Sequence, residues 1–449
     1  MSIKPSYYRV AEMTSGGRTV DFRVACASID YYEDVLCPTY SCKIQVVNSG
    51  GNIPDGQGNL VSLYEALKIS AGEEVKLFIA SNSPTNIDLD FAETRSFYNN
   101  GVSELERDTE REFFTLHLLS KEAMLDGTIF LGKKYPKETP ISSQVETILE
   151  ESFPGSLVNL IDPTMSPYGW IGMNMHPFLA VTKLASKAVP GETGGTPAGG
   201  SATAGFFFYQ TSQGFNFRSI DNLISKTPVA KYVSTELNTS RYSYRSTPEL
   251  PSLDYKIMAY KVVRNQNIVE NLTKGTFAAK RNFFDPFSFR LTDDRASFTG
   301  DSYIKKGVKN LGDFFDPSRL KLEGATISFT ELPSIILTEN LNLGTLDTNA
   351  KSTQPTTRIE EYSAQSRMRY NSLFNQILNM QVPLNTNLHA GDIIECLFPK
   401  VTLGLKEWDE GQLSGIYMIR GLCHHYDTRG SYTSLQIVRD TFGVVPINA

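Results

Sequence analysis

Apolar and polar residues alternate along several segments of this chain with the two-residue period of half-buried β-strands. In residues 39–47 every second side chain is apolar, and the turn-forming run 48–52 then ends the pattern. Similar runs predict strands at residues 19–25, after Gly72 and at 113–119. We therefore expect a barrel or a strongly curved sheet in the amino-terminal part of the chain.

The two ends of the chain share a pattern, which predicts an internal duplication. A small acidic turn precedes an apolar run in residues 71–78 and again in residues 390–398. Further along, each copy contains a strand that closes with a cation and an anion, in residues 114–122 and 432–440. We interpret the pair as a duplicated β-barrel unit. The alternative is that short strands in β-rich proteins resemble one another.

Between these ends the apolar period changes to that of helices. Thr139 is a candidate N-cap with Pro140 at the first helical position, and apolar residues at helical spacing follow up to Pro154. A second helix is predicted from Pro177, and residues 206–217 predict a β-hairpin. Together these elements predict a small α+β domain.

Residues 190–205 are dominated by Gly, Ala, Ser, Thr and Pro, and we expect a flexible loop there. A phosphate-binding loop is excluded, because the run lacks a Gly-Lys-Ser/Thr ending and leads into a strand instead of a helix. The predicted organisation is a first tube-type barrel domain at 1–125, an α+β domain at 126–225, a β-rich segment with the start of a second barrel plus an insertion at 226–342, a linker at 343–358, and a helix with the remainder of the second barrel at 359–449.

Charge and cysteine content exclude several classes of protein. The chain has 449 residues and a formal net charge of −6, which argues against a surface that grips nucleic acid phosphates. It has no apolar run long enough for a transmembrane helix and no secretory signal, so we expect folding in a cytoplasm. The odd number of cysteines favours reduced, buried thiols within strand-like runs: Cys26, Cys37, Cys42, Cys396 and Cys423.

Candidate chemical sites are sparse. His424 and His425, close to Asp427, are the only histidine cluster, but neighbours on a strand point to opposite faces and cannot share a metal ion. Nucleophile elbows and separated acid–base pairs are absent. Trp170, Tyr168 and Trp408 are candidates for a sugar-binding platform, but two tryptophans this far apart in the sequence favour packing anchors. We therefore predict no enzyme, and we assign no catalytic, cofactor-binding or metal-binding residue.

Several segments of the chain share one further likeness: residues 31–40, 174–178, 206–217, 388–399 and 414–424. Together they resemble the baseplate central hub proteins of T-even-like contractile-tailed bacteriophages. That family adapts the tail tube to the spike and is related to the hub part of contractile injection system spike proteins. The likeness is spread over most of the chain, and residues 225–360 contribute little to it.

The resemblance implies a homotrimer in which two tube-type barrels per chain form a pseudo-sixfold ring. Such a ring joins the sixfold tail tube to the threefold cell-puncturing spike and leaves an axial channel through which DNA passes without specific binding. The implied partners are the spike protein, the tail tube protein and baseplate wedge proteins, without membrane insertion. The implied location is the virion tail baseplate, with assembly in the host cytoplasm and the spike on a separate polypeptide. Two alternatives stay open: a glycan-binding or glycan-cleaving tail protein, or the hub of a bacterial contractile injection system.

Overall fold

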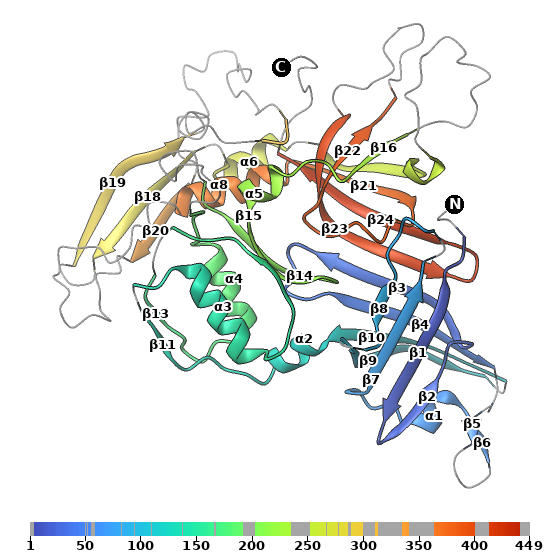
Figure 1. Ribbon diagram of the computed structural model, residues 1–449. Helices are drawn as coiled ribbons and strands as arrows, with labels where there is room; N and C mark the ends of the chain where they lie inside the picture. Colours follow the sequence, from blue (N-terminus) through green and yellow to red (C-terminus); the bar gives the residue numbers. More distant parts are fainter. Residues whose placement is uncertain are drawn as a thin grey trace, which may run out of the picture.

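A computed structural model of the chain shows one large sheet of 14 strands with smaller sheets and helices around it (Figure 1). This confirms the predicted mainly β, α+β class. The middle of the predicted flexible loop and all of the predicted linker 343–358 lie outside the described part of the chain. The described residues are 4–49, 51, 53–54, 59–81, 83–93, 95–108, 110–136, 138–165, 168–191, 203–234, 252–265, 267–276, 278–285, 289–299, 310–312, 335–340, 363–399 and 413–440.

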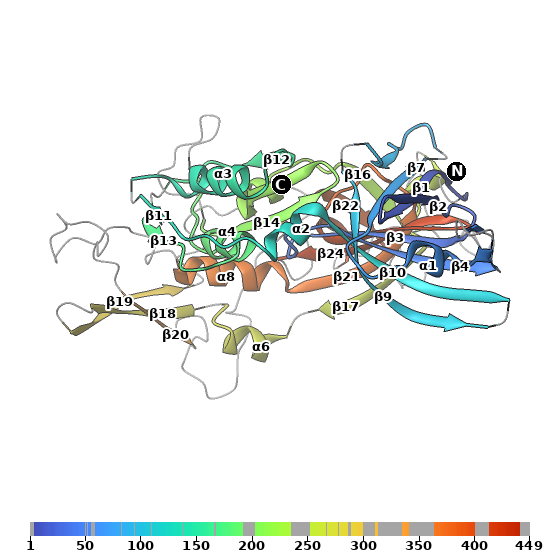
Figure 2. The same cartoon turned by 90° about the horizontal axis from the view of Figure 1, so that it is seen from below.

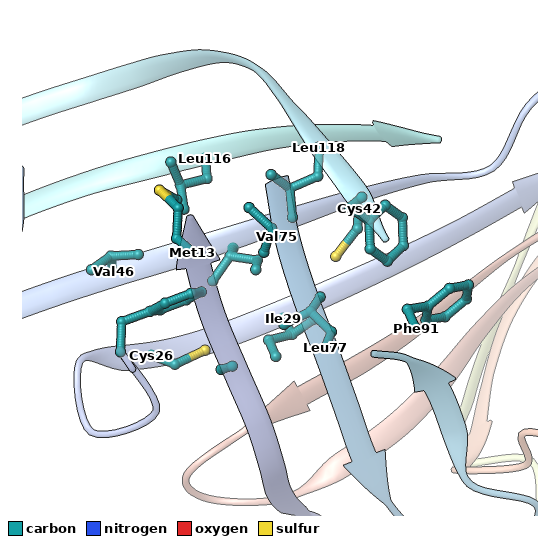
Figure 3. Packing of buried hydrophobic residues seen from close by; sticks show 14 of the residues in the cluster. Met13, Cys26, Ile29, Cys42, Val46, Val75, Leu77, Phe91, Leu116 and Leu118 are labelled. Atoms are coloured by element: carbon teal, nitrogen blue, oxygen red, sulfur yellow. The ribbon is translucent and has the colours of Figure 1, made fainter. Parts of the chain in front are cut away.

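The amino-terminal part of the chain is a sheet folded back on itself. Strands β1 and β7 cross over β3, β4 and β10, and apolar side chains such as Met13, Ile29 and Leu116 fill the space between them (Figure 3). Burying each such side chain stabilises the fold by roughly 1.5–3 kcal/mol. The elements are β1 (Tyr7–Ser15), β2 (Arg18–Asp21), β3 (Cys26–Asp34), β4 (Ser41–Ser49), β5 (Ile53–Pro54), β6 (Leu60–Val61), α1 (Leu63–Leu67), β7 (Glu74–Ala80), β8 (Leu89–Phe91), β9 (Phe97–Arg107) and β10 (Arg111–Ser120).

The small α+β domain follows, and its helices and hairpin confirm the predicted elements. Its helix α3 begins one residue later than expected: Pro140 stands at the N-cap, without a side-chain hydrogen bond, and Thr139 lies outside the helix. Helix α4 begins at Pro177 as predicted. The elements are α2 (Lys121–Asp126), β11 (Lys134–Tyr135), α3 (Ile141–Ser152), β12 (Val158–Ile161), β13 (Trp170–Ile171), α4 (Pro177–Ala185), β14 (Phe206–Thr211), β15 (Gly214–Ser219) and α5 (Ile220–Ile224).

The carboxy-terminal part completes the large sheet. Its core, around Leu378, Ile394 and Tyr417, is separate from the core of the first part. The helix expected at 360–373 is described from Ser363 onward. The elements are β16 (Ala230–Val233), η2 (Leu253–Tyr255), β17 (Ala259–Asn265), α6 (Ile268–Thr273), α8 (Ser363–Leu373), β21 (Gln376–Pro383), β22 (Ile393–Leu397), β23 (Gly415–Asp427) and β24 (Ser431–Arg439).

A separate three-stranded sheet lies at the periphery, apart from the large sheet (Figure 2). Its central strand pairs antiparallel with one neighbour and parallel with the other. The strands are β18 (Ala278–Asp285), β19 (Arg290–Thr299) and β20 (Ile335–Asn340).

The large sheet contains the same four-strand arrangement twice. We call β3-β4-β10-β9 unit I and β17-β21-β24-β23 unit II. Hydrogen-bonded neighbours within the sheet follow the order β17-β21-β24-β23-β3-β4-β10-β9, so the two units are joined head to tail where β23 pairs with β3. Each unit also carries a matching pair of strands, β7 with β1 in unit I and β22 with β16 in unit II. The two pairs differ in direction, since β1 is antiparallel to β7 and β16 is parallel to β22.

The duplicated acidic turn has the same hydrogen bonds in both units. In unit I the Gly72 amide donates to the Asn99 carbonyl at 2.7 Å, and the Asn99 amide donates to the Glu73 carbonyl at 2.9 Å. In unit II Gly391 donates to the carbonyl of Ile419, and Ile419 donates to that of Asp392, both at 2.8 Å. Both glycines have positive φ, 92° and 86°. The structure therefore confirms the duplication that the two turns predicted.

A bulge at matching positions strengthens this conclusion. The pairing of β9 with β10 skips one residue just before Gly101, and the pairing of β23 with β24 skips one residue just before Gly421. A β-bulge bends its strand and increases the local twist. Both units therefore curve at the same point.

One part of the predicted duplication is wrong. In the pairing registers Leu119 and Val438 occupy equivalent positions. The alignment of the two strands by sequence differs from this by one residue. Lys121 is exposed and opens helix α2, whereas Arg439 is buried against Gln376. The two cation–anion pairs are therefore not equivalent. The strand expected at residues 19–25 is also shorter than predicted, ending at Asp21.

Candidate functional site

The large sheet leaves one polar face open, and this face is the main candidate for function. Side chains on a strand alternate between two faces, and in both units one set packs into the buried cores while the other stays at least partly exposed. We call the second set the open face. Its members include Asp30, Tyr32, Asp34, Ser41, Lys43, Gln45, Ser103, His117, Lys261, Asn379, Gln381, Cys423, His425, Asp427, Tyr432, Ser434 and Gln436.

Polar contacts cross the open face where unit I meets unit II. His425 Nδ1 lies 2.5 Å from Asp30 Oδ1, and its Nε2 lies 3.5 Å from Asp427 Oδ2. The hydrogen bond with Asp30, assisted by the charges of Asp30 and Asp427, raises the pKa of His425 above 6.5 against the effect of burial. Further along, the Gln436 side-chain amide donates to Asn379 Oδ1 at 3.1 Å. These pairs fix the strands laterally and leave a continuous polar surface.

The open face is hollowed across the junction of the two units. A hollow of about 720 Å³ is lined by residues of β3, β4, β17, β21, β23 and β24. Aspartates and lysines both occur on the open face, with Asp30, Asp34 and Asp427 against Lys43 and Lys261. Arg420, whose guanidinium lies 3.7 Å from the Asp34 carboxylate, adds a third cation, so the charge is mixed and lacks the cationic excess of a nucleic acid-binding groove.

A buried joint lies beneath the same junction and ties three parts of the chain together. The Glu33 carboxylate, on β3, accepts hydrogen bonds from the Ser212 amide at 2.8 Å, the Ala390 amide at 3.0 Å and the Tyr31 hydroxyl at 2.8 Å. Ser212 belongs to the turn between β14 and β15, and Ala390 to the duplicated turn before β22. The joint therefore links unit I, the α+β domain and unit II.

A histidine completes this joint. His389 Nδ1 lies 3.5 Å from Glu33 Oε1. Burial alone would raise the pKa of Glu33, but the charge of His389 and the hydrogen bonds it receives hold that pKa below 4.5. Burial lowers the pKa of His389, but the Glu33 and Asp392 carboxylates outweigh it and hold the pKa above 6.5. The pair is therefore charged at mildly acidic pH.

The structure separates the two neighbouring histidines as predicted. His424 is buried, stacks on Tyr31 and contacts Thr433 Oγ1 at 3.0 Å, whereas His425 lies on the open face. Burial lowers the pKa of His424 to about 4. Within the described residues no group of three or more His, Cys, Asp and Glu side chains could hold a metal ion.

Other residues singled out from the sequence serve the fold. Trp170 stacks on Tyr135 with ring centroids 4.5 Å apart and donates to Gln144 Oε1, so it is a packing anchor as expected. Trp408 lies outside the described residues. All five cysteines are free thiols, but Cys37 is exposed and Cys423 is half-buried, contrary to the expectation that all are buried.

Glu33 and the bulge glycines are the structural residues that the sequence did not single out. Glu33 stands in a run of alternating residues on β3, but its partners lie far away in the sequence, at positions 212 and 390. Gly101 follows Asn99-Asn100, and Gly421 follows Ile419-Arg420. Because these two pairs differ in polarity, only the glycine after each of them could have indicated that the two bulges are equivalent.

Comparison with known proteins supports the fold alone. No family model matches the chain, and a search of curated proteins finds no similar sequence. A 43 kDa tail protein of prophage MuSo2 from Shewanella oneidensis is similar in structure, with a TM-score of 0.52, 9% identity, and coverage of 97% of this chain and 100% of that chain.

Two further solved structures resemble the chain more weakly. One is a tail protein from Neisseria meningitidis, with a TM-score of 0.47, 10% identity and 97% of each chain covered. The other is an E. coli component of the type VI secretion system, described as structurally similar to the T4 phage tail proteins gp27 and gp5, with a TM-score of 0.40, 11% identity, and coverage of 94% of this chain and 76% of that chain. Of the three, only the prophage tail protein exceeds 0.5, and the fold assignment rests on it. This chain therefore has the fold of a phage tail protein.

In the part of the chain that the structure describes, no helix combines the length and the apolar character that a membrane span requires.

Proposed function

We propose that this chain is the structural hub of a contractile tail baseplate, a homotrimer that adapts the sixfold tail tube to a threefold spike. The observation that carries the proposal is the head-to-tail repeat of two equivalent four-strand units within one sheet. A chain with two similar units forms a ring of six similar units when three copies close around an axis. Such a ring matches a sixfold partner on one side and a threefold partner on the other.

The open face is the natural lining of the axial channel in this proposal. It is polar, continuous across both units, and hollowed at their junction. Without a cationic excess it would not hold the phosphates of DNA, so DNA could pass without binding. The apolar side of the same sheet is covered by β1, β7, β16 and β22, which places the cores on the outer side of the ring.

The proposed partners follow from this arrangement. The tail tube protein and the spike protein would contact the two rims of the ring, and wedge proteins its outer surface. The peripheral sheet β18–β20 and the α+β domain lie to one side of the large sheet and are available for such outer contacts (Figures 1 and 2). The same assembly would serve a phage tail or a bacterial contractile injection system. We also propose that the domains of the chain meet at residues 125 and 225, as predicted from the sequence.

The oligomeric mass tests this proposal. The chain mass is 50.0 kDa, and we expect light scattering coupled to size exclusion to give three times that value, either for the protein alone or after addition of a spike protein from the same genome. A single-chain mass under both conditions would contradict the hub assignment. Retention on a bacterial polysaccharide column in that case would favour the glycan-binding alternative.

A further inference from the structure

The junction between the two units inside the chain predicts the junction between chains. Unit II joins unit I through antiparallel pairing of β23 with β3. The matching strands at the two ends of the eight-strand path are β9, which corresponds to β23, and β17, which corresponds to β3. In the described residues, the half of β9 beyond Asn99 pairs only with β10, and β17 pairs only with β21. Each end of the path therefore presents one unpaired strand edge.

We infer that the free edge of β9 in one copy pairs antiparallel with β17 of a second copy, repeating the β23–β3 junction between chains. This inference rests on the proposed function, because it specifies the surface through which the ring would close. A head-to-tail contact of this kind generates a closed ring or an open filament, according to the rotation between copies.

The registers inside the chain fix the pairing between chains. The shared turn and bulge make Val102 equivalent to Leu422, and Ser103 equivalent to Cys423. The pairing of β21 with β17 and of β4 with β3 makes Arg264 equivalent to Tyr32.

Cys423 is the Cα partner of Tyr32, and Leu422 is the Cα partner of Glu33. Ser103 of one copy is therefore expected opposite Arg264 of the next. By the same reasoning Val102 is expected opposite Asn265.

The side chains on the two edges suit a second copy. The outer half of β9 exposes Glu104 and Glu106, whereas β17 exposes Lys261. Opposite charges on facing strands stabilise a pair by roughly 0.2–1 kcal/mol each. β17 also exposes apolar surface, with Tyr260 at 40% and Val263 at 52% exposure. An unpaired strand edge of this composition is a template for pairing with another chain.

Disulfide trapping tests the inference, and the equivalent junction within one chain provides its positive control. In a background with the exposed Cys37 changed to Ser, the variant Ser103→Cys, Arg264→Cys places two thiols at the predicted cross-chain pair. Facing strand residues lie within the reach of a disulfide. The positive control is Tyr32→Cys, which faces the native Cys423 at the equivalent junction within one chain.

The negative control is Ser103→Cys, Ala259→Cys. Ala259 lies roughly 16 Å along β17 from Arg264, beyond the ~7 Å limit between Cα atoms. We expect mild oxidation of the predicted pair to convert most of the protein into a covalent trimer on non-reducing gels, at least tenfold more than the negative control. If Arg264→Cys does not fold, Val102→Cys, Asn265→Cys tests the adjacent pair.

The outcomes separate the junction from the hub assignment. A trimer in solution that forms no disulfide at either predicted pair overturns the strand junction and leaves the hub proposal standing. Covalent species of more than three chains support the strand junction and contradict the closure of the ring with three chains. A monomer without cross-linking, both alone and with the spike protein added, overturns both.

Discussion

Replacing Gly391 with alanine is expected to destabilise the protein much more than the same change at Gly72, although the two glycines occupy equivalent turns. Both have positive φ, where an alanine costs roughly 1–2 kcal/mol. At Gly391 an added Cβ also meets the buried hydroxyl of Tyr209, whereas at Gly72 it meets nothing within 4 Å. Overpacking of this kind costs roughly 1–3 kcal/mol more.

We therefore expect Gly391→Ala to lower the free energy of unfolding by about 2–5 kcal/mol in total and Gly72→Ala by about 1–2 kcal/mol. Thermal or urea unfolding of both variants measures the difference. A second change, Tyr209→Phe, removes the contacting hydroxyl and should restore part of the stability in the Gly391→Ala background but none in the Gly72→Ala background. Equal losses from the two alanine variants would show that Tyr209 does not restrict this turn.

Loss of the Glu33 carboxylate is expected to be the other severe change. Glu33→Ala leaves the amides of Ser212 and Ala390 without their acceptor and His389 without its nearest carboxylate. Breaking a buried, hydrogen-bonded ion pair from one side costs roughly 3–5 kcal/mol. Glu33→Gln keeps the shape and one acceptor oxygen, so its cost should be smaller. The exposed Glu110 provides the control, for which a change to Ala should alter stability by less than ~0.5 kcal/mol.

The pH dependence of stability gives this prediction a second readout. The lowered pKa of Glu33 means that its contribution is present above pH 4.5 and is lost as the pH falls through its folded value. The raised pKa of His389 means that its contribution is present below pH 6.5 and is lost as the pH rises through its folded value. The joint should therefore stabilise most between these two values.

Melting temperatures across pH 4 to 8 should consequently fall less steeply at both ends in Glu33→Ala than in the parent protein. His425, whose pKa is also raised, is present in both proteins and contributes the same pH dependence to both melting curves. A parallel pair of curves would assign the loss of stability in Glu33→Ala to packing alone.

Much of the local structure could be predicted because it is set by local patterns. Alternation over residues 39–47 predicts β4, because each apolar side chain there enters the same core. Pro177 marks the first residue of α4, because proline at this position loses no hydrogen bond. The acidic turns predict the duplication, because Gly72 and Gly391 both adopt a conformation that favours glycine.

Other elements could not be predicted because they depend on distant residues. The outer half of β9 is exposed, so burial imposes no alternation on it. The pairing of β3 with β23 joins residues such as Asp34 and Gly421, and no local signal encodes that register. The joint around Glu33 is similarly assembled from three separate segments. Its carboxylate is recognisable only when the fold brings the Ser212 and Ala390 amides to it.

The central claim is that two equivalent units per chain close into a ring with three chains, and direct imaging of the purified protein tests it most simply. Averaged negative-stain images should show a ring with a central hole, a nearly sixfold outline and threefold peripheral lobes, the lobes arising from the α+β domain and the β18–β20 sheet. Compact single-chain particles, alone and with the spike protein added, would contradict the account.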